Sequence, residues 1–172
     1  NRLDPNLSFA GVAEGLARSA QHKSKEALAS FRAAAKAHPN DAFTQYLLAE
    51  ALSEQNLAPG TPEYAEAIAA ATRATTLDPR QLSALNLLST LSLRDGHTQH
   101  AIDYSQKALA VDPNDPQALY HLLLALRKTD RKDEIPAVLK RLIAARDATQ
   151  SGMPKKRYKL DEVPATQSLA TY

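Results

Sequence analysis

The sequence predicts an all-α protein, a right-handed α-solenoid of stacked helical hairpins, and three observations predict it. Alanine and leucine dominate the composition, aromatic residues reach only 5%, and the runs of β-branched residues typical of strands are missing. Four similar strings end at Pro5, Pro39, Pro79 and Pro113, so proline recurs after 34, 40 and 34 residues. Between these prolines, apolar residues return at the three- and four-residue steps that mark one face of a helix.

The unit at 82–115 shows the repeating pattern most clearly. Its first helix carries Leu85, Leu88 and Leu91, and Gly96 follows as a residue suited to a left-handed turn. Pro113 then stops the second helix, because proline cannot continue one. In every unit, three positions on the second helix are predicted to pack the hairpin, and small residues there let the two helices approach closely. These positions are Ala27, Phe31 and Ala34; Ala67, Ala71 and Ala74; Ala101, Ser105 and Ala108; and Ile135, Leu139 and Leu142.

The period, the turn glycine, the spaced small residues and the closing proline together resemble the tetratricopeptide-repeat (TPR) family, whose unit is a helix–turn–helix of 34 residues. The resemblance covers residues 1 to about 149. It departs from the family early in each first helix, where the usual large aromatic residue is replaced by Gly11, Gln45, Leu85 and Leu119. The family's small residue midway along that helix is kept as Gly15, Ala49 and Ser89, and becomes Leu123 in the last unit.

The resemblance implies four repeats between two flanking segments. The expected divisions are the remnant of a preceding repeat at 1–7, TPR repeats at 8–41, 42–81, 82–115 and 116–149, and an extended basic tail at 150–172. The 40-residue spacing places a loop insertion near 56–61, between the two helices of the second repeat. Thr61 is then expected to cap the following helix, and Pro62 to lie in its first turn, where a missing N–H has no cost.

Charge and composition exclude several classes of function. Residues 1–149 carry 17 basic and 17 acidic side chains, so the body of the protein gives no electrostatic reason to expect nucleic acid. Without cysteine there are no disulfides or thiolate metal sites, and no phosphate-binding glycine loop or nucleophile motif is present. We expect no enzyme activity, no cofactor and no metal, even at His97 and His100, which lack a third ligand. No apolar run approaches the roughly 20 residues of a membrane span.

The compartment stays open between the cytoplasm and export. The chain begins with Asn1 rather than Met, from which we expect a segment upstream. The string at 132–136, the basic linker after it and the string at 157–160 resemble the C-terminal regions of acidobacterial TPR proteins. That resemblance implies an exported protein in a multi-protein assembly.

The resemblance also implies where a partner binds, because the first helices of stacked repeats line a concave groove that takes an extended peptide or a partner helix. The groove residues it implies are Phe9, Val12 and Leu16; Phe43, Tyr46, Glu50 and Glu54; Asn86, Thr90 and Arg94; and Tyr120, His121, Leu124 and Arg127. Asn86 and Arg94 are favoured as binding residues, since hairpin packing does not need them. The aromatic residues serve either binding or inter-repeat packing. Val12 and Leu16 replace the Lys and Asn that clamp a chaperone's C-terminal carboxylate in some TPR domains.

The sequence therefore predicts a non-catalytic adaptor for a protein or peptide partner, within a larger chain or assembly. The alternative is a structural subunit of a larger complex or filament, held through its ends and its tail. Three interpretations of the tail stay open: a solvated terminus, a cap that folds back over the last repeat, or a contact with another subunit or an anionic surface. The tail residues concerned are Lys155, Lys156, Arg157, Tyr158, Lys159 and Leu160.

Overall fold

The computed structural model describes the backbone of residues 5–151 and the side chains of residues 11–149. Within this part, the chain forms eight α-helices and one 3-10 turn, and no strand. The elements are α1 (Pro5–Ala20), α2 (Ser24–Ala37), α3 (Ala42–Ser53), α4 (Pro62–Leu77), α5 (Leu82–Arg94), α6 (Thr98–Val111), α7 (Pro116–Leu126), η1 (Lys132–Glu134) and α8 (Ile135–Ser151). The predicted all-α fold is confirmed.

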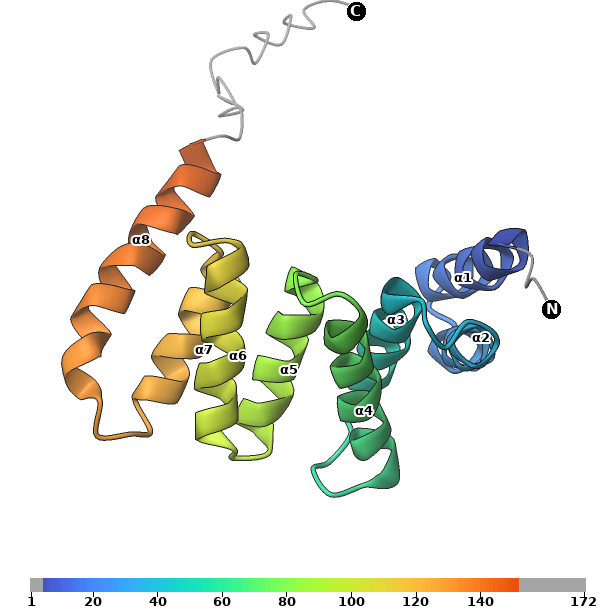
Figure 1. Ribbon diagram of the computed structural model, residues 1–172, viewed down its shortest axis with the longest axis horizontal. Helices are drawn as coiled ribbons and strands as arrows, with labels where there is room; N and C mark the ends of the chain where they lie inside the picture. The colour runs from blue at the N-terminus through green and yellow to red at the C-terminus, as the bar shows by residue number, and fades with distance from the viewer. Residues whose placement is uncertain (1–4, 152–172) are drawn as a thin grey trace, which may run out of the picture.

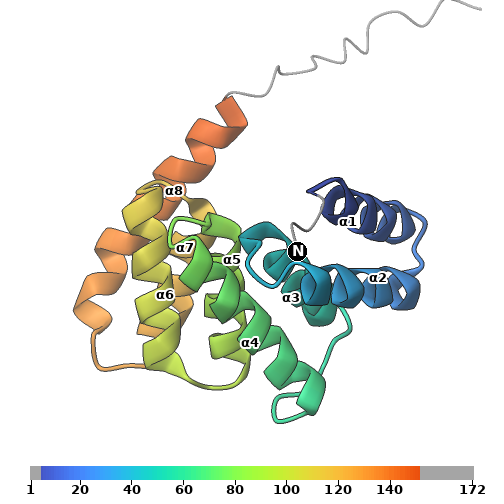
Figure 2. The ribbon, with the colours of Figure 1, turned by 45° about the vertical axis from the view of Figure 1, so that its right-hand side comes forward.

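The helices pair into four hairpins, α1/α2, α3/α4, α5/α6 and α7/α8, which stack in chain order. Figure 1 shows α1 and α2 at one end of the stack and α8 at the other. In the turned view of Figure 2, the axes of α1 and α2 run across those of α6 and α8, so the hairpins rotate as they stack. The two helices of each hairpin pack on each other, and each hairpin packs on the next, as α2 does on α3 and α6 on α7. This nearest-neighbour packing defines a solenoid.

Local sequence signals set several helix ends. The Thr61 hydroxyl accepts a hydrogen bond of 3.3 Å from the Tyr64 N–H at the start of α4, with Pro62 in the first turn, so this prediction is confirmed. Asp41 caps α3 in the same way. Gly96 has a φ of +77° between α5 and α6, the left-handed geometry that glycine adopts at little cost.

The small residues of the second helices form the seams of the hairpins. All nine side chains predicted for α2, α4 and α6 are buried. In α8 the prediction is confirmed for Leu142, which is buried, and is wrong for Leu139, which is 42% exposed while Val138 is buried. The buried stripe of α8 runs through Ile135, Val138, Leu142 and Ala145. Ile135 and Leu142 thus keep their predicted places, and only the residue between them differs, because the stripe takes a three-residue step to Val138 instead of a four-residue step to Leu139.

A glycine allows the closest approach within the first hairpin. A Cβ placed on Gly15 of α1 would lie 2.5 Å from the Phe31 ring of α2, and that ring is buried in the core.

Between hairpins, the Tyr64 hydroxyl of α4 donates a 2.5 Å hydrogen bond to the Leu91 carbonyl oxygen of α5. The neighbouring hairpins are thus joined by both apolar packing and a buried polar bond.

The bounds of helix α1 and of the α3–α4 loop can be compared with the repeat boundaries expected from the sequence. Helix α1 begins at Pro5 and so includes residues 5–7, which the repeat spacing placed before the first unit. The loop between α3 and α4 spans 54–61, the stretch in which the repeat spacing places the insertion. Residues 1–4 and the tail from 152 onward lie outside the described residues. In the described part, no helix is both long and apolar enough to cross a membrane.

Candidate functional site

The predicted groove residues lie on α1, α3, α5 and α7, the first helices of the four hairpins. We call the surface that these helices share the first-helix face. Helix α3 packs on α5, and α5 packs on α7, so the face is continuous from α3 to α7. A cleft lined by Leu16 of α1 and Glu50 of α3 lies at its N-terminal end. The side chain of Phe9 lies outside the described residues, and Val12 is buried in the core.

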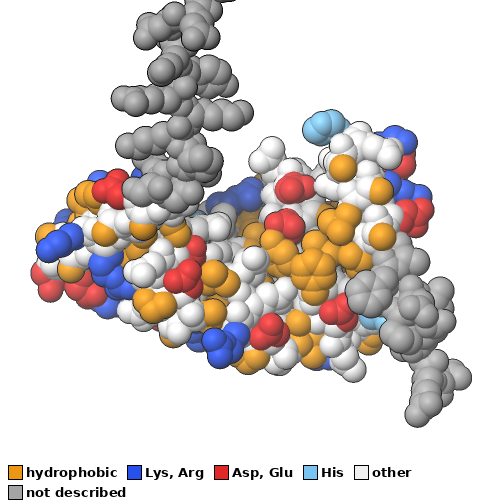
Figure 3. Space-filling model, turned by 90° about the horizontal axis from the view of Figure 1, so that it is seen from above, with side chains coloured by type: hydrophobic (Ala, Val, Ile, Leu, Met, Phe, Trp, Pro, Cys, Tyr) orange, Lys and Arg blue, Asp and Glu red, His pale blue; other side chains and the backbone are white. Residues whose placement is uncertain are grey.

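At the N-terminal end of this face, apolar and acidic side chains lie together. Leu16 and Phe43 are 46% and 50% exposed. The Phe43 and Tyr46 rings lie 6.3 Å apart, and the Tyr46 hydroxyl donates a hydrogen bond to the Glu50 carboxylate. Leu16, Glu50 and Glu54 line one narrow cleft between α1, α2 and α3. We call Leu16, Phe43, Tyr46, Glu50 and Glu54 the α1/α3 patch. Figure 3 shows hydrophobic side chains gathered toward the N-terminal end of the molecule, with acidic side chains beside them.

In the middle of the face, polar side chains join two repeats. Asn86 of α5 is only 3% exposed, and its Nδ2 donates a 2.6 Å hydrogen bond to Asp115 Oδ2. The same carboxylate caps α7 by accepting from the Ala118 N–H at 3.0 Å. The Asn86 amide therefore ties α5 to the start of α7, which is a contact between repeats rather than within one hairpin. A binding role for Asn86 stays a prediction.

Thr90 and His121 make a second contact between α5 and α7, beside that of Asn86 and Asp115. His121 is 7% exposed, and its Nε2 lies 3.2 Å from the Thr90 hydroxyl oxygen. Burial lowers the pKa of His121, and the nearby Asp115 carboxylate opposes this shift in part. His121 Nδ1 and Asn86 Oδ1 are buried and have no hydrogen-bond partner among the described side chains. His121 is thus a neutral, packed residue of the repeat junction.

Arg94 supports the loop insertion. Its Nη2 donates a 2.8 Å hydrogen bond to the Leu57 carbonyl oxygen, and its guanidinium carbon lies 5.8 Å from the centre of the Tyr64 ring. Both contacts reach from α5 back to the α3–α4 loop and to α4. The side chain is exposed, but its hydrogen-bonding capacity is partly used within the chain.

At the C-terminal end of the face, Tyr120 is exposed, Leu124 is half-buried and Arg127 is exposed at the end of α7. Arg146 of α8 lies over the Tyr120 ring, with its guanidinium carbon 5.8 Å from the ring centre. The sequence analysis did not identify Arg146, because its contact with Tyr120 joins two different helices, α8 and α7. It also missed Asp115, although an acidic residue directly before Pro116 is a helix-start signal.

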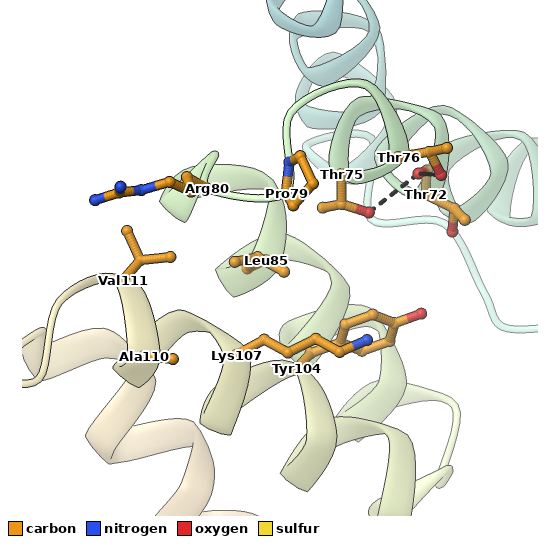
Figure 4. Close-up of a pocket in the computed structure, with 10 residues that line it drawn as sticks. All are labelled: Thr72, Thr75, Thr76, Pro79, Arg80, Leu85, Tyr104, Lys107, Ala110 and Val111. Carbon is orange, nitrogen blue, oxygen red and sulfur yellow. Dashed lines mark hydrogen bonds between the residues drawn. The ribbon is translucent and has the colours of Figure 1, made fainter.

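A larger cleft of about 740 Å³ opens between α4 and α6 (Figure 4). Two of its three threonine hydroxyls, those of Thr75 and Thr76, donate to the Thr72 carbonyl oxygen. The Lys107 ammonium lies 5.4 Å from the centre of the Tyr104 ring. In Figure 4 the Arg80 side chain extends away from Lys107, so the two cations do not converge on one ligand position.

The described residues contain no cluster of three or more His, Asp or Glu side chains that would hold a metal ion. The His97 and His100 rings lie 5.5 Å apart, and His97 Nδ1 is 2.8 Å from a carboxylate oxygen of Asp95. His97 and Asp95 therefore form a surface pair at the turn between α5 and α6.

The stacked hairpins, the small residues in their seams and the 34-residue period define a TPR solenoid. Solved structures with the same fold include MamA (TM-score 0.75, 20% identity, 86% of this chain and 83% of that one covered). Others are YrrB, a TPR protein (0.70, 17%, 86% and 73%), and the first TPR domain of Spaghetti (RPAP3) in complex with an HSP90 peptide (0.67, 17%, 73% and 95%). The model of the bacterial transcriptional activator domain (BTAD) family matches residues 3–145, and the chain belongs to that family. None of the curated proteins compared with the chain matches it.

Proposed function

We propose that the protein is a non-catalytic scaffold whose first-helix face binds an extended peptide or a helix of a protein partner. The observation that carries the proposal is the exposure of Leu16 and Phe43 beside Tyr46 on packed helices. The exposed surfaces of Leu16 and Phe43 contribute nothing to the core, and exposed apolar surface on packed helices is a mark of an interaction site. Aromatic side chains held on rigid helices also lose little entropy on binding.

The structural neighbours support peptide binding by this fold. The RPAP3 domain was solved with the HSP90 peptide SRMEEVD, and YrrB is described as having an unusual peptide-binding site. For the present chain, an acidic peptide of that kind fits poorly. Leu16 stands in place of a clamp residue, Val12 is buried, and the nearby Glu50 and Glu54 would repel a carboxylate.

Membership of a family named for bacterial transcriptional activators also bears on the partner. Residues 1–149 carry equal numbers of basic and acidic side chains, which provides no excess positive charge for a DNA backbone. Within a transcriptional regulator, this domain would contact protein rather than nucleic acid.

Peptide selection from a random displayed library tests the proposal. Selected peptides should bind the intact chain and lose at least about tenfold in affinity for the variant Leu16→Ala/Phe43→Ala, because two exposed apolar contacts are removed. The matched control is Leu139→Ala/Ile143→Ala, since these two side chains of α8 are 42% and 53% exposed. Calorimetry measures binding, and circular dichroism confirms that both variants stay folded. Peptides that bind the Leu16/Phe43 variant as tightly as the intact chain would overturn the proposal.

The second candidate is a structural subunit held by its ends, and the exposed pair Leu139 and Ile143 on the terminal helix favours it. In pull-downs from source cells, a partner lost only with the Leu139→Ala/Ile143→Ala variant would support this candidate. A partner lost only with the Leu16→Ala/Phe43→Ala variant would support the scaffold.

A further inference from the structure

The α1/α3 patch holds two carboxylates without a cationic partner. None of the ion pairs formed by side chains 11–149 includes Glu50 or Glu54. Arg94, a cation of the first-helix face on the neighbouring α5, instead donates to a loop carbonyl and lies over the Tyr64 ring. Glu50 accepts a single side-chain hydrogen bond among the described residues, from Tyr46, so most of its acceptor capacity is unused there.

The shape of the patch specifies which ligand would satisfy these carboxylates. The narrow cleft brings Leu16 and Leu47 next to Glu50 and Glu54. A lysine or arginine side chain matches this arrangement, because its aliphatic stem can lie on leucine while its charged head meets a carboxylate. The adjacent Phe43 and Tyr46 rings suit a neighbouring aromatic or leucine side chain. The complementary segment is therefore basic, with apolar residues between the charges.

The chain itself contains such a segment. The whole excess positive charge of the sequence lies after Gln150, where four basic residues accompany two acidic ones. All four basic residues fall within 155–160, which also includes Tyr158 and Leu160 and contains no acidic residue. Residues 155–160 lie outside the described part of the structure, so the argument rests on their sequence alone.

The last repeat is a poor acceptor for this segment. The exposed apolar residues of α8, Leu139 and Ile143, are flanked by Lys140, Arg141 and Arg146. A basic segment folded back onto this helix would bring like charges together, which is unfavourable. Charge therefore disfavours the interpretation in which 155–160 caps its own repeat.

Geometry favours a second copy over the same chain. The patch and α8 lie at opposite ends of the stack (Figure 1). Nine residues beyond Ser151 span at most about 32 Å. Three helix-to-helix steps, from α8 through α7 and α5 to α3, already take up about 24–30 Å before the segment turns back.

We propose that residues 155–160 of one copy dock on the α1/α3 patch of a second copy, with basic side chains at Glu50 and Glu54 and Tyr158 or Leu160 against Phe43. The contact joins two different surfaces, so each copy keeps one free patch and one free segment, and association continues head to tail. The inference rests on the proposed function, since it uses the same face.

Reversing the charges of the patch and of the segment, one at a time, tests the inference on the chain of residues 1–172. The patch variant is Glu50→Lys/Glu54→Lys, and the segment variant is Lys155→Glu/Lys156→Glu/Arg157→Glu/Lys159→Glu. Sedimentation velocity should show concentration-dependent association of the unmodified chain that weakens at high salt. Each variant alone should associate at least about tenfold more weakly, and an equimolar mixture of the two should recover association, because each variant then offers the complement of the other. The control Glu26→Lys/Asp130→Lys reverses two exposed acidic residues elsewhere and should associate like the unmodified chain.

Crosslinking of a mixture of isotope-labelled and unlabelled chains shows which copy supplies the segment. Crosslinks between labelled and unlabelled chains, from Lys155 or Lys159 to Glu50 or Glu54, are the expected result. Crosslinks confined to one chain, no recovery in the mixture, or a monomeric unmodified chain would each overturn the inference. If the selected peptides still lose affinity for the Leu16→Ala/Phe43→Ala variant in that case, the proposed function stands and only the choice of occupant fails.

Discussion

Replacing Asn86 by alanine separates a structural role from a binding role at the centre of the first-helix face. The substitution removes the 2.6 Å hydrogen bond from Asn86 Nδ2 to the Asp115 carboxylate. A hydrogen bond to a charged group contributes about 1.5–3 kcal/mol, and the site is almost fully buried, so water cannot readily replace the amide. We expect Asn86→Ala to lower the free energy of unfolding by about 2 kcal/mol, and Tm by about 4–8 °C for a domain of this size.

Urea unfolding followed by circular dichroism measures this loss. Ser83→Ala is the matched control, because Ser83 lies exposed on the same helix and should change stability by less than about 0.5 kcal/mol. A double-mutant cycle with Asp115→Ser, which keeps a capping oxygen, should give a coupling of about 1 kcal/mol or more. If Asn86→Ala is as stable as Ser83→Ala and instead loses peptide binding, the structural account of Asn86 is refuted.

Two further predictions concern the buried histidine and the tight helix contact. Because burial lowers the pKa of His121, unfolded chains take up a proton below about pH 6.5 that folded chains do not, so stability should fall on acidification by up to about 1.4 kcal/mol per pH unit until the lowered pKa is passed. His121→Gln should remove this part of the slope in urea unfolding between about pH 5 and 7.5, and an unchanged slope would contradict the assignment. Gly15→Ala should destabilise the chain by about 1–2 kcal/mol, since the added methyl meets the buried Phe31 ring and outweighs the gain in helix propensity. Gly11→Ala, with ordinary 3.4 Å contacts on the same helix, should be neutral or stabilising in the same thermal melt, and equal effects of the two would argue against the contact.

The family and the hairpin seams could be predicted from sequence because the relevant interactions are local and repeated. Ala71 and Ala101 recur at fixed steps before a proline, and a buried small residue at that step follows from the geometry of two helices in contact. The N-cap at Thr61 and the turn at Gly96 depend only on a few adjacent residues. The position of Val138 in the core did not follow from the pattern, because steps of three and of four residues both keep a side chain on one face of a helix, and packing on α7 selects Val138 over Leu139.

For the candidate site too, some properties followed from the sequence and others only from the packing of the repeats. The repeat period placed Phe43 on the first helix of a repeat, and the resemblance to TPR repeats left open whether its ring serves binding or inter-repeat packing. Only the tertiary structure decided that Phe43 is exposed while Asn86, at the equivalent of a groove position, is buried. The physical reason is that exposure of a groove residue depends on how far the next repeat reaches across it. The partner of Asn86 is Asp115, which lies 29 residues further along the chain and meets it only after α7 has packed on α5.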